Sequence, residues 1–166
     1  MEFGALQCIP KKPICKDCIF NNQCIAFSQA KVSFLPVKAK KVKVKSRYLH
    51  FFVLIDKDKN TLLQRREGKG IWQNLYQFPL IETFTKQKHF QKFQLLSLLA
   101  DLQITSDFVI NKWNHEPILQ NLTHQHLEIN FWIVNLTEST NLEIKKSQIH
   151  QYPMPKALQN FRDKFF

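Results

Sequence analysis

Glycine and acidic residues are both scarce in this sequence. The 166 residues include three glycines, and 13 acidic residues stand against 24 lysines and arginines, which gives a formal net charge of +11. No apolar stretch approaches the roughly 18 residues of a membrane-spanning helix, and no secretory signal segment is visible. We therefore expect no membrane association. The charge favours a polyanionic partner such as nucleic acid, although a soluble basic protein without such a partner has the same composition.

Cysteine is absent from the whole chain after residue 24. All four cysteines precede that point, with gaps of six, two and five residues between Cys8, Cys15, Cys18 and Cys24. A disulfide framework would spread its cysteines through a small secreted domain, so this crowding argues against one and favours a reducing cytoplasm. Four thiolates gathered so closely suit either a structural zinc ion or an iron–sulfur cluster, and the spacing alone does not choose between them.

Three regions follow one another along the chain. Residues 1–27 form the cysteine-rich loop, and residues 48–166 hold enough apolar material, including most of the fifteen phenylalanines, for one folded domain. Between them, residues 28–47 form a basic linker without an acidic residue. Its cations either remain solvated or neutralise DNA phosphates, and we favour phosphate contact for Lys38, Lys40 and Lys41.

The pattern of the third region predicts a mixed α/β (α+β) sheet with flanking helices. Expected strands cover residues 49–55, 61–65, 107–113, 117–123, 127–134 and 148–152. One expected helix covers residues 86–101, and a closing helix opens at Pro155 and ends near Phe165. Within the first helix, the spacing predicts a buried stripe of Phe90, Phe93, Leu96 and Leu99, widened by Leu95 and Leu98.

The cysteine spacing, preceded by Met1–Leu6 and followed by Phe34–Lys38 and a strand-rich region, resembles the MutY-type adenine DNA glycosylases. The resemblance implies that Cys8, Cys15, Cys18 and Cys24 hold a 4Fe–4S cluster, and that the chain is the C-terminal portion of such an enzyme. The family's catalytic Glu and Asp belong to a helical domain that precedes the cysteine loop. We therefore expect no catalytic residue in this chain and no base excision by it alone.

The segment from Arg65 to Trp72, followed by Phe78-Pro79, resembles a Nudix-like (MutT-like) fold. A Nudix hydrolase needs a series of glutamates on one helix to bind magnesium. Here Leu80-Ile81 replace the expected glycines, and the predicted helix has no acid before Asp101. We therefore expect the fold without diphosphate hydrolysis.

In the family, a short segment at a turn between strands checks the base opposite adenine and prefers 8-oxoguanine. The matching positions here are Leu122, Thr123 and His124. The resemblance implies double-stranded DNA with an 8-oxoguanine:adenine mispair as partner, together with the N-terminal catalytic domain, in a monomer of the bacterial cytoplasm associated with the nucleoid. The alternatives are a zinc-stabilised nucleic-acid-binding module and, less favoured, a Nudix hydrolase.

Overall fold

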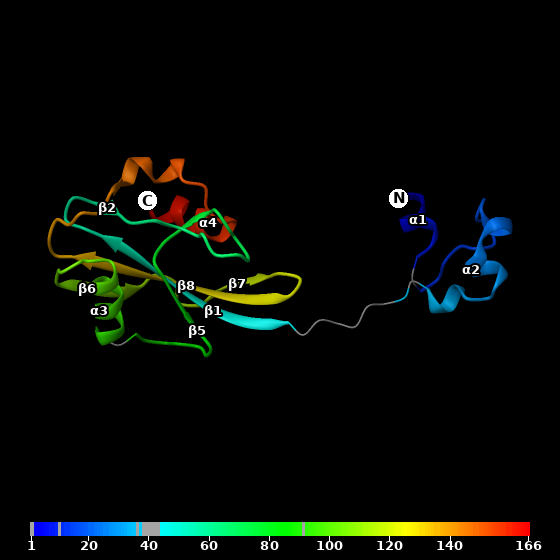
Figure 1. Cartoon of the computed structure of the whole chain (residues 1–166), viewed down its shortest axis with the longest axis horizontal. Coiled ribbons are helices and arrows are strands. Elements are labelled where there is room, and N and C mark those ends of the chain that lie inside the picture. Colours follow the sequence, from blue (N-terminus) through cyan, green and yellow to red (C-terminus); the bar gives the residue numbers. More distant parts are fainter. Residues whose placement is uncertain (1, 10, 36, 38–43, 91) are drawn as a thin grey trace. The chain divides into compact units, whose positions relative to one another are not determined.

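The computed structural model describes residues 2–9, 11–35, 37, 44–90 and 92–166 (Figure 1). The chain divides into two compact units, Met1–Val42 and Lys43–Phe166. Among the described residues, no helix combines the length and the apolar character needed to cross a membrane.

The first unit consists of short helical turns around the cysteines. They are α1 (Glu2–Gln7), η1 (Asn21–Gln23), α2 (Ile25–Ser28) and η2 (Val32–Phe34). Each is only one or two turns long and is closed by local backbone hydrogen bonds, such as Ser28 N–H to Cys24 O at 2.9 Å. The rings of Phe3 and Phe20 meet edge to face at 5.4 Å and hold α1 against the turn that precedes η1.

The second unit is built on two long parallel strands, β1 (Lys45–Ile55) and β8 (Gln125–Leu136). They pair over eleven positions, from Lys45↔Gln125 to Ile55↔Asn135. The sheet order is β5-β1-β8-β6, and β7 pairs with the N-terminal half of β8. The outer strands are antiparallel to the central pair: β5 (Leu80–Thr83), β6 (Phe108–Lys112) and β7 (Ile118–Asn121). Two small antiparallel pairs complete the strands: β2 (Asn60–Thr61) with β9 (Ile144–Lys145), and β3 (Gln64–Arg65) with β4 (Tyr76–Gln77).

Helices cover both faces of this sheet, which confirms the predicted mixed α/β fold (Figure 1). On one face, α4 (Lys156–Phe165) and η3 (Lys146–Gln151) pack against the odd-numbered side chains of β1 and β8, and the Phe161 ring stacks on Phe131 at 3.9 Å. On the other face, α3 (Lys92–Asp101) packs against the even-numbered side chains, including Phe52 and Trp132. Successive side chains of a strand point to opposite faces, and both faces are covered here. The two central strands are therefore apolar at odd and even positions alike.

Several predicted elements need correction. The helix expected at residues 86–101 begins only at Lys92. Of the predicted stripe, Leu95 and Leu99 are buried as expected, whereas the prediction is wrong for Phe93 and Leu96, which are 64% and 48% exposed. Phe90 lies before α3 and is not part of the helix. Its ring packs edge to face on the Phe52 and Trp132 rings.

The strands beside these elements also differ from the prediction. The strand expected at residues 148–152 is the 3-10 helix η3, because β9 at Ile144–Lys145 already occupies the edge beside β2. The strand expected at residues 61–65 is divided between β2 and β3, which belong to different sheets. The closing helix begins after Pro155, as predicted.

A fully buried histidine joins β1 to its neighbours on the α3 face. His50 Nδ1 accepts a hydrogen bond from Trp132 Nε1–H at 3.3 Å. Its Nε2 lies 3.2 Å from Thr83 Oγ1, which in turn donates to Thr85 O at 2.7 Å. Since the Thr83 hydroxyl proton is used in that bond, His50 Nε2–H is the donor, and the ring is neutral with its proton on Nε2.

We expect this histidine to make the fold sensitive to acid. Burial, assisted by the charge of Lys112, lowers the pKa of His50 from 6.5 to about 4. The unfolded chain therefore binds the proton first as pH falls, so stability is full above about pH 6.5 and is lost between that pH and pH 4. From pH 7 to pH 4.5, wild type should lose about 2–3 kcal/mol more unfolding free energy than His50→Gln, as measured by urea denaturation. Equal losses in the two proteins would contradict this role.

Candidate nucleic-acid interface

The β7–β8 hairpin presents Thr123 and His124 at its turn (Figure 1). The turn is closed by backbone hydrogen bonds in both directions between Leu122 and Gln125, at 2.8 and 3.4 Å. Both turn side chains are exposed, and they extend from the N-terminal end of the longest strand of the sheet. A two-residue turn on a strand of this length fixes the position of its side chains.

Leu122, the third predicted contact residue, lies differently from the other two. Its side chain is half-buried and packs against the core on the α4 face. It therefore anchors the turn to the domain, while Thr123 and His124 are the side chains directed to solvent.

The start of β1 lies directly beside this turn. The Lys45 backbone N–H donates to His124 O at 3.1 Å, and Lys45 pairs with Gln125 in the parallel ladder. The basic linker therefore reaches the folded domain next to the predicted reading residues. Its three cations predicted to contact phosphate, Lys38, Lys40 and Lys41, lie outside the described residues.

Arg47 connects three strands behind the turn. Its Nε and Nη2 donate to the two carboxylate oxygens of Glu82 on β5, both at 2.6 Å, and its Nη1 donates to Gln125 Oε1 on β8 at 2.9 Å. The hydrogen bonds to Glu82 raise the pKa of Arg47 and lower the pKa of the Glu82 carboxyl. This two-point contact between a guanidinium and a carboxylate is geometrically specific, so it stiffens the base of the hairpin.

Polar pairs also organise the opposite face of the hairpin. His126 Nδ1 lies 2.6 Å from Asn121 Oδ1 across the β7–β8 pair, which leaves His126 Nε2 directed elsewhere. Lys86 Nζ pairs with Glu128 at 3.0 Å. Glu82 and Glu128 are thus each paired with a cation, so neither carboxylate near the turn is left without a partner.

The four cysteines of the first unit line one small cavity of about 30 Å³. Cys8 is exposed and the other three are half-buried. Burial raises the pKa of the Cys15 thiol, and the charges of Cys24, Cys8 and Cys18 raise it further, so all four sulfur atoms share one electrostatic environment. As they stand, no three His, Cys, Asp or Glu side chains of the described chain form a group able to hold a metal ion. The donor set suits a thiolate-bound metal centre, and the loop must tighten to enclose one.

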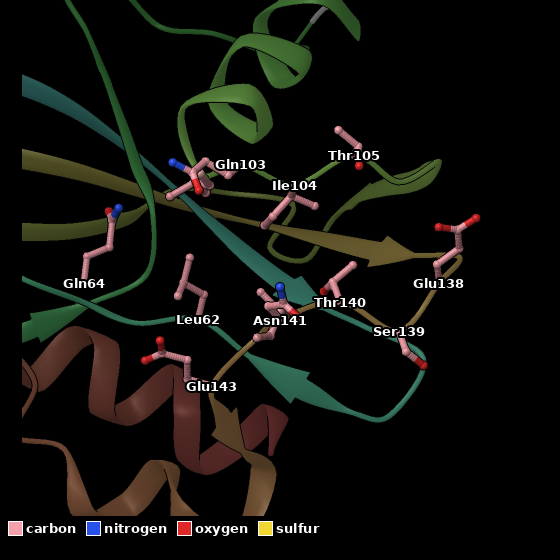
Figure 2. Close-up of a pocket in the computed structure, with 12 residues that line it drawn as sticks. Leu62, Gln64, Gln103, Ile104, Thr105, Glu138, Ser139, Thr140, Asn141 and Glu143 are labelled. Atoms are coloured by element: carbon pink, nitrogen blue, oxygen red, sulfur yellow. The ribbon is translucent and has the colours of Figure 1, made fainter.

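A cavity of about 510 Å³ lies at the other end of β8, between the C-terminal end of α3 and residues 138–143 (Figure 2). Figure 2 shows Glu138 and Glu143 on opposite sides of this cavity, with neutral polar side chains such as Gln64 and Gln103 around it. Asp101 is the single carboxylate of α3 within Lys92–Asp101. The series of glutamates on one helix that a Nudix hydrolase needs is therefore missing from α3 as the structure describes it.

Comparison with known proteins gives a consistent set of relatives. A family model described as a NUDIX domain matches residues 50–164. The adenine DNA glycosylase of Buchnera aphidicola subsp. Schizaphis graminum (strain Sg) is 27% identical over 170 residues, which cover 99% of this chain and 47% of that protein. The adenine DNA glycosylase of subsp. Acyrthosiphon pisum (strain APS) is 28% identical over 152 residues, covering 76% of this chain and 42% of that protein. The chain thus spans less than half the length of these curated relatives.

Among solved structures, the MutT protein from Methanosarcina mazei Go1 is similar with a TM-score of 0.52 and 11% sequence identity. The similarity covers 75% of this chain and 95% of that one. At this identity the comparison supports the fold alone. It agrees with the mixed sheet flanked by helices on both faces.

Proposed function

Since this chain belongs to the NUDIX domain family and corresponds to the C-terminal part of a MutY-type adenine DNA glycosylase, we propose that it recognises 8-oxoguanine opposite adenine in duplex DNA. The observation that carries this proposal is the exposed Thr123–His124 turn, held at a fixed position beside the cationic start of β1. The zinc-stabilised module and the hydrolase are the competing functions. The absence of the glutamate series from the described α3 disfavours the hydrolase.

Recognition at the turn follows from the chemistry of the oxidised base. Guanine presents N7 as an acceptor, whereas 8-oxoguanine presents an N7–H donor and a C8=O acceptor. The Thr123 hydroxyl is both a donor and an acceptor, so it can satisfy this altered edge, and the His124 ring adds a second polar contact to base or phosphate. Since the hydroxyl can also donate to guanine N7, the preference comes from the second group of the lesion: 8-oxoguanine offers two hydrogen-bonding groups at this edge where guanine offers N7 alone, so one contact is lost with guanine.

Cations around the turn supply affinity without reading the base. Lys45 and the linker lysines Lys38, Lys40 and Lys41 would each neutralise a phosphate, which positions the duplex but carries no sequence information. Arg47 holds β1, β5 and β8 together, so that the reading turn keeps its place when DNA binds. In this division of roles, removing a lysine weakens all duplexes equally, whereas changing the turn changes the preference between them.

The four cysteines would hold a 4Fe–4S cluster in the first unit. Burial is the main cause of the raised Cys15 pKa, and the charges of the other three cysteines in the same cavity add to it; a bound cluster would compensate the charge of the four thiolates. Lys11, Lys12 and Lys16 lie in the same loop and would compensate the negative charge of the cluster.

The first unit also exposes an unusual amount of apolar surface for its size. Its exposed apolar side chains include Leu6, Ile19, Phe20, Ile25, Phe34 and Val37. Such surface commonly marks a protein–protein contact. We propose that it packs against a catalytic domain that would supply the glycosylase chemistry, as the greater length of the relatives allows. Adenine removal would belong to that assembled protein.

Substitution at the turn tests the proposed recognition. We expect Thr123→Ala to lower the ratio of affinities for 8-oxoguanine:adenine over guanine:adenine duplexes by about tenfold, since a specific base contact contributes about 1–3 kcal/mol. The exposed Thr105→Ala, beside the cavity at the far end of β8, is the matched control and should keep the wild-type ratio. Fluorescence anisotropy with labelled duplexes measures both, and an unchanged ratio in Thr123→Ala would overturn the assignment of the turn.

A further inference from the structure

We propose that Arg66, together with Arg47, forms an anion site that binds a backbone phosphate of the DNA strand whose base is read at the Thr123–His124 turn. This inference rests on the proposed function and adds to it the DNA group, a backbone phosphate, that the domain would bind beside the lesion. The sequence alone indicates no binding role for Arg66, and Arg47 belongs there to the basic linker at residues 28–47.

The Arg66 side chain is held in place from two sides. Arg66 follows β3 directly and begins the loop of residues 66–75, whose ends are joined by Arg66 N–H to Leu75 O at 2.9 Å and Asn74 N–H to Arg66 O at 2.7 Å. Its Nη1 donates to Gln77 Oε1 on β4 at 3.1 Å, and Gln77 is buried. The guanidinium is therefore a fixed group at the rim of the core and not a freely moving surface side chain.

The charges around Arg66 do not balance. The charges of Arg47 and Glu82 both act on Arg66, so two half-buried guanidinium groups lie near one carboxylate. Both oxygens of the Glu82 carboxylate already accept hydrogen bonds from Arg47. The partner that the structure gives Arg66 is a neutral amide. Burial lowers the pKa of Arg66 and the nearby charge of Arg47 lowers it further, while Glu82 raises it. The cluster thus holds one positive charge more than it neutralises, in a place where solvent compensates it only in part.

A phosphodiester group is the ligand that suits this excess. It has one negative charge and several acceptor oxygens, and a planar guanidinium binds such groups through parallel hydrogen bonds. Within the loop the exposed Lys69 is matched by the exposed Glu67, and Arg65 on β3 adds a further exposed cation, whereas the Glu82 carboxylate is already paired. A protein carboxylate would neutralise the charge equally well, but the strongly basic surface of this chain favours a polyanion.

The position of the cluster points to the strand that is read. Arg47 Nη1 donates to Gln125, which directly follows the turn residues Thr123 and His124 and closes the turn with Leu122. A phosphate held by Arg66 and Arg47 would therefore lie on the strand whose base reaches the turn. The loop is also held in a costly shape: Trp72 and Asn74 have φ of +62° and +65°, in the left-handed region that bulky residues rarely adopt. Strain retained in a loop beside a binding surface is typical of functional sites.

This arrangement predicts opposite effects on folding and on binding. In the protein without DNA, Arg66→Gln removes the repulsion between Arg66 and Arg47 and places an amide donor beside Gln77 in place of the guanidinium, so the melting temperature should stay unchanged or rise. The same substitution should weaken DNA binding. A purely structural arginine would behave in the opposite way, since its loss would lower the melting temperature and leave DNA binding as it was.

The test is a salt titration of duplex binding by anisotropy, with melting temperatures measured in parallel. For wild type and Arg66→Gln, log Kd is plotted against log salt concentration, and loss of one phosphate contact should reduce the slope by about 0.9. Arg66→Lys keeps the charge and should restore most of that slope. Arg162→Gln removes a half-buried arginine of α4 that pairs with Asp163, and it should leave the slope unchanged.

A wild-type slope in Arg66→Gln would overturn the anion site, and so would a lowered melting temperature with DNA binding retained. The ratio of affinities for 8-oxoguanine and guanine duplexes is read from the same samples. A wild-type ratio of one would contradict lesion recognition, whereas the change of slope tests the phosphate contact on either duplex. The two failures are therefore distinguishable.

Discussion

Anaerobic reconstitution with iron and sulfide is expected to load the wild-type chain with a 4Fe–4S cluster and to leave Cys18→Ser without one. Cys18 belongs to the central Cys-x2-Cys pair and lines the same cavity as the other three cysteines. Serine oxygen is a poor substitute for a thiolate at iron, so three remaining thiolates should not retain the cluster through desalting. Iron and acid-labile sulfide in the desalted protein measure the result.

The remaining cysteines supply the control for this experiment. If Cys8, Cys15 and Cys24 are also ligands, each serine variant should lose iron and sulfide to a similar degree, whereas Ser28→Ala beside the loop should keep them. Zinc bound in place of iron by the wild type would contradict the cluster and support the zinc-stabilised module. Iron retained equally by Cys18→Ser would show that Cys18 is not a ligand.

Truncation of Phe161 is expected to lower the free energy of unfolding by about 3–5 kcal/mol. Its fully buried ring stacks on Phe131 at 3.9 Å and meets Phe78 and Trp113 edge to face at 5.6 and 4.9 Å. Alanine would remove the ring that joins α4 to the central strands and would leave a cavity that these rigid aromatic neighbours cannot fill. Urea denaturation of Phe161→Ala and wild type measures the loss.

Phe84 provides a matched control because its side chain is fully exposed. Phe84→Ala should change the unfolding free energy by no more than about 0.5 kcal/mol. Similar small changes in both variants would mean that α4 is not part of the cooperative core. β8 runs from that core to the Thr123–His124 turn. Loss of the Phe161 ring is therefore expected to loosen the position of the turn as well.

The hairpin that carries the reading turn was predictable from the sequence because its signal is local. The strand pattern predicts a hairpin between residues 117–123 and 127–134, and the structure has one, but its turn is Thr123–His124, one residue inside the first expected strand; the family resemblance, not the local pattern, pointed to these two residues. The cysteine cavity was predictable for the same reason, since four cysteines within one short loop have little freedom to separate. The helix opened by Pro155 follows from the fixed backbone angle of proline.

The arginine cluster could not be predicted in this way. Arg47, Glu82 and Gln125 are far apart in sequence and meet only because β5, β1 and β8 are adjacent in a particular register. A one-residue shift of that register would place them on opposite faces, and nothing in the local pattern fixes it. The buried face of α3 was predicted only in part because its leucines fall in two adjacent pairs, Leu95-Leu96 and Leu98-Leu99, so the periodicity does not decide which member of each pair is buried.

The two ends of β8 differ in the side chains that surround them. At one end lie the cationic start of β1 and the exposed turn. At the other lies the cavity lined by Glu138 and Glu143, without the series of glutamates on α3 that magnesium chemistry needs. The proposed binding function therefore rests on the residues at the turn and not on the NUDIX fold, because function depends on the residues of a site and not on the fold alone.

Lesion recognition by this chain is tested most directly by fluorescence anisotropy with two duplexes that differ in one base. One contains 8-oxoguanine opposite adenine and the other contains guanine opposite adenine, and both are measured at two salt concentrations. We predict that wild type binds the lesion duplex at least about tenfold more tightly at both salt concentrations, because the discriminating contacts are hydrogen bonds to the base and not to phosphate. Equal affinities that fall steeply together as salt rises would contradict this prediction and would reduce the domain to a phosphate-binding module.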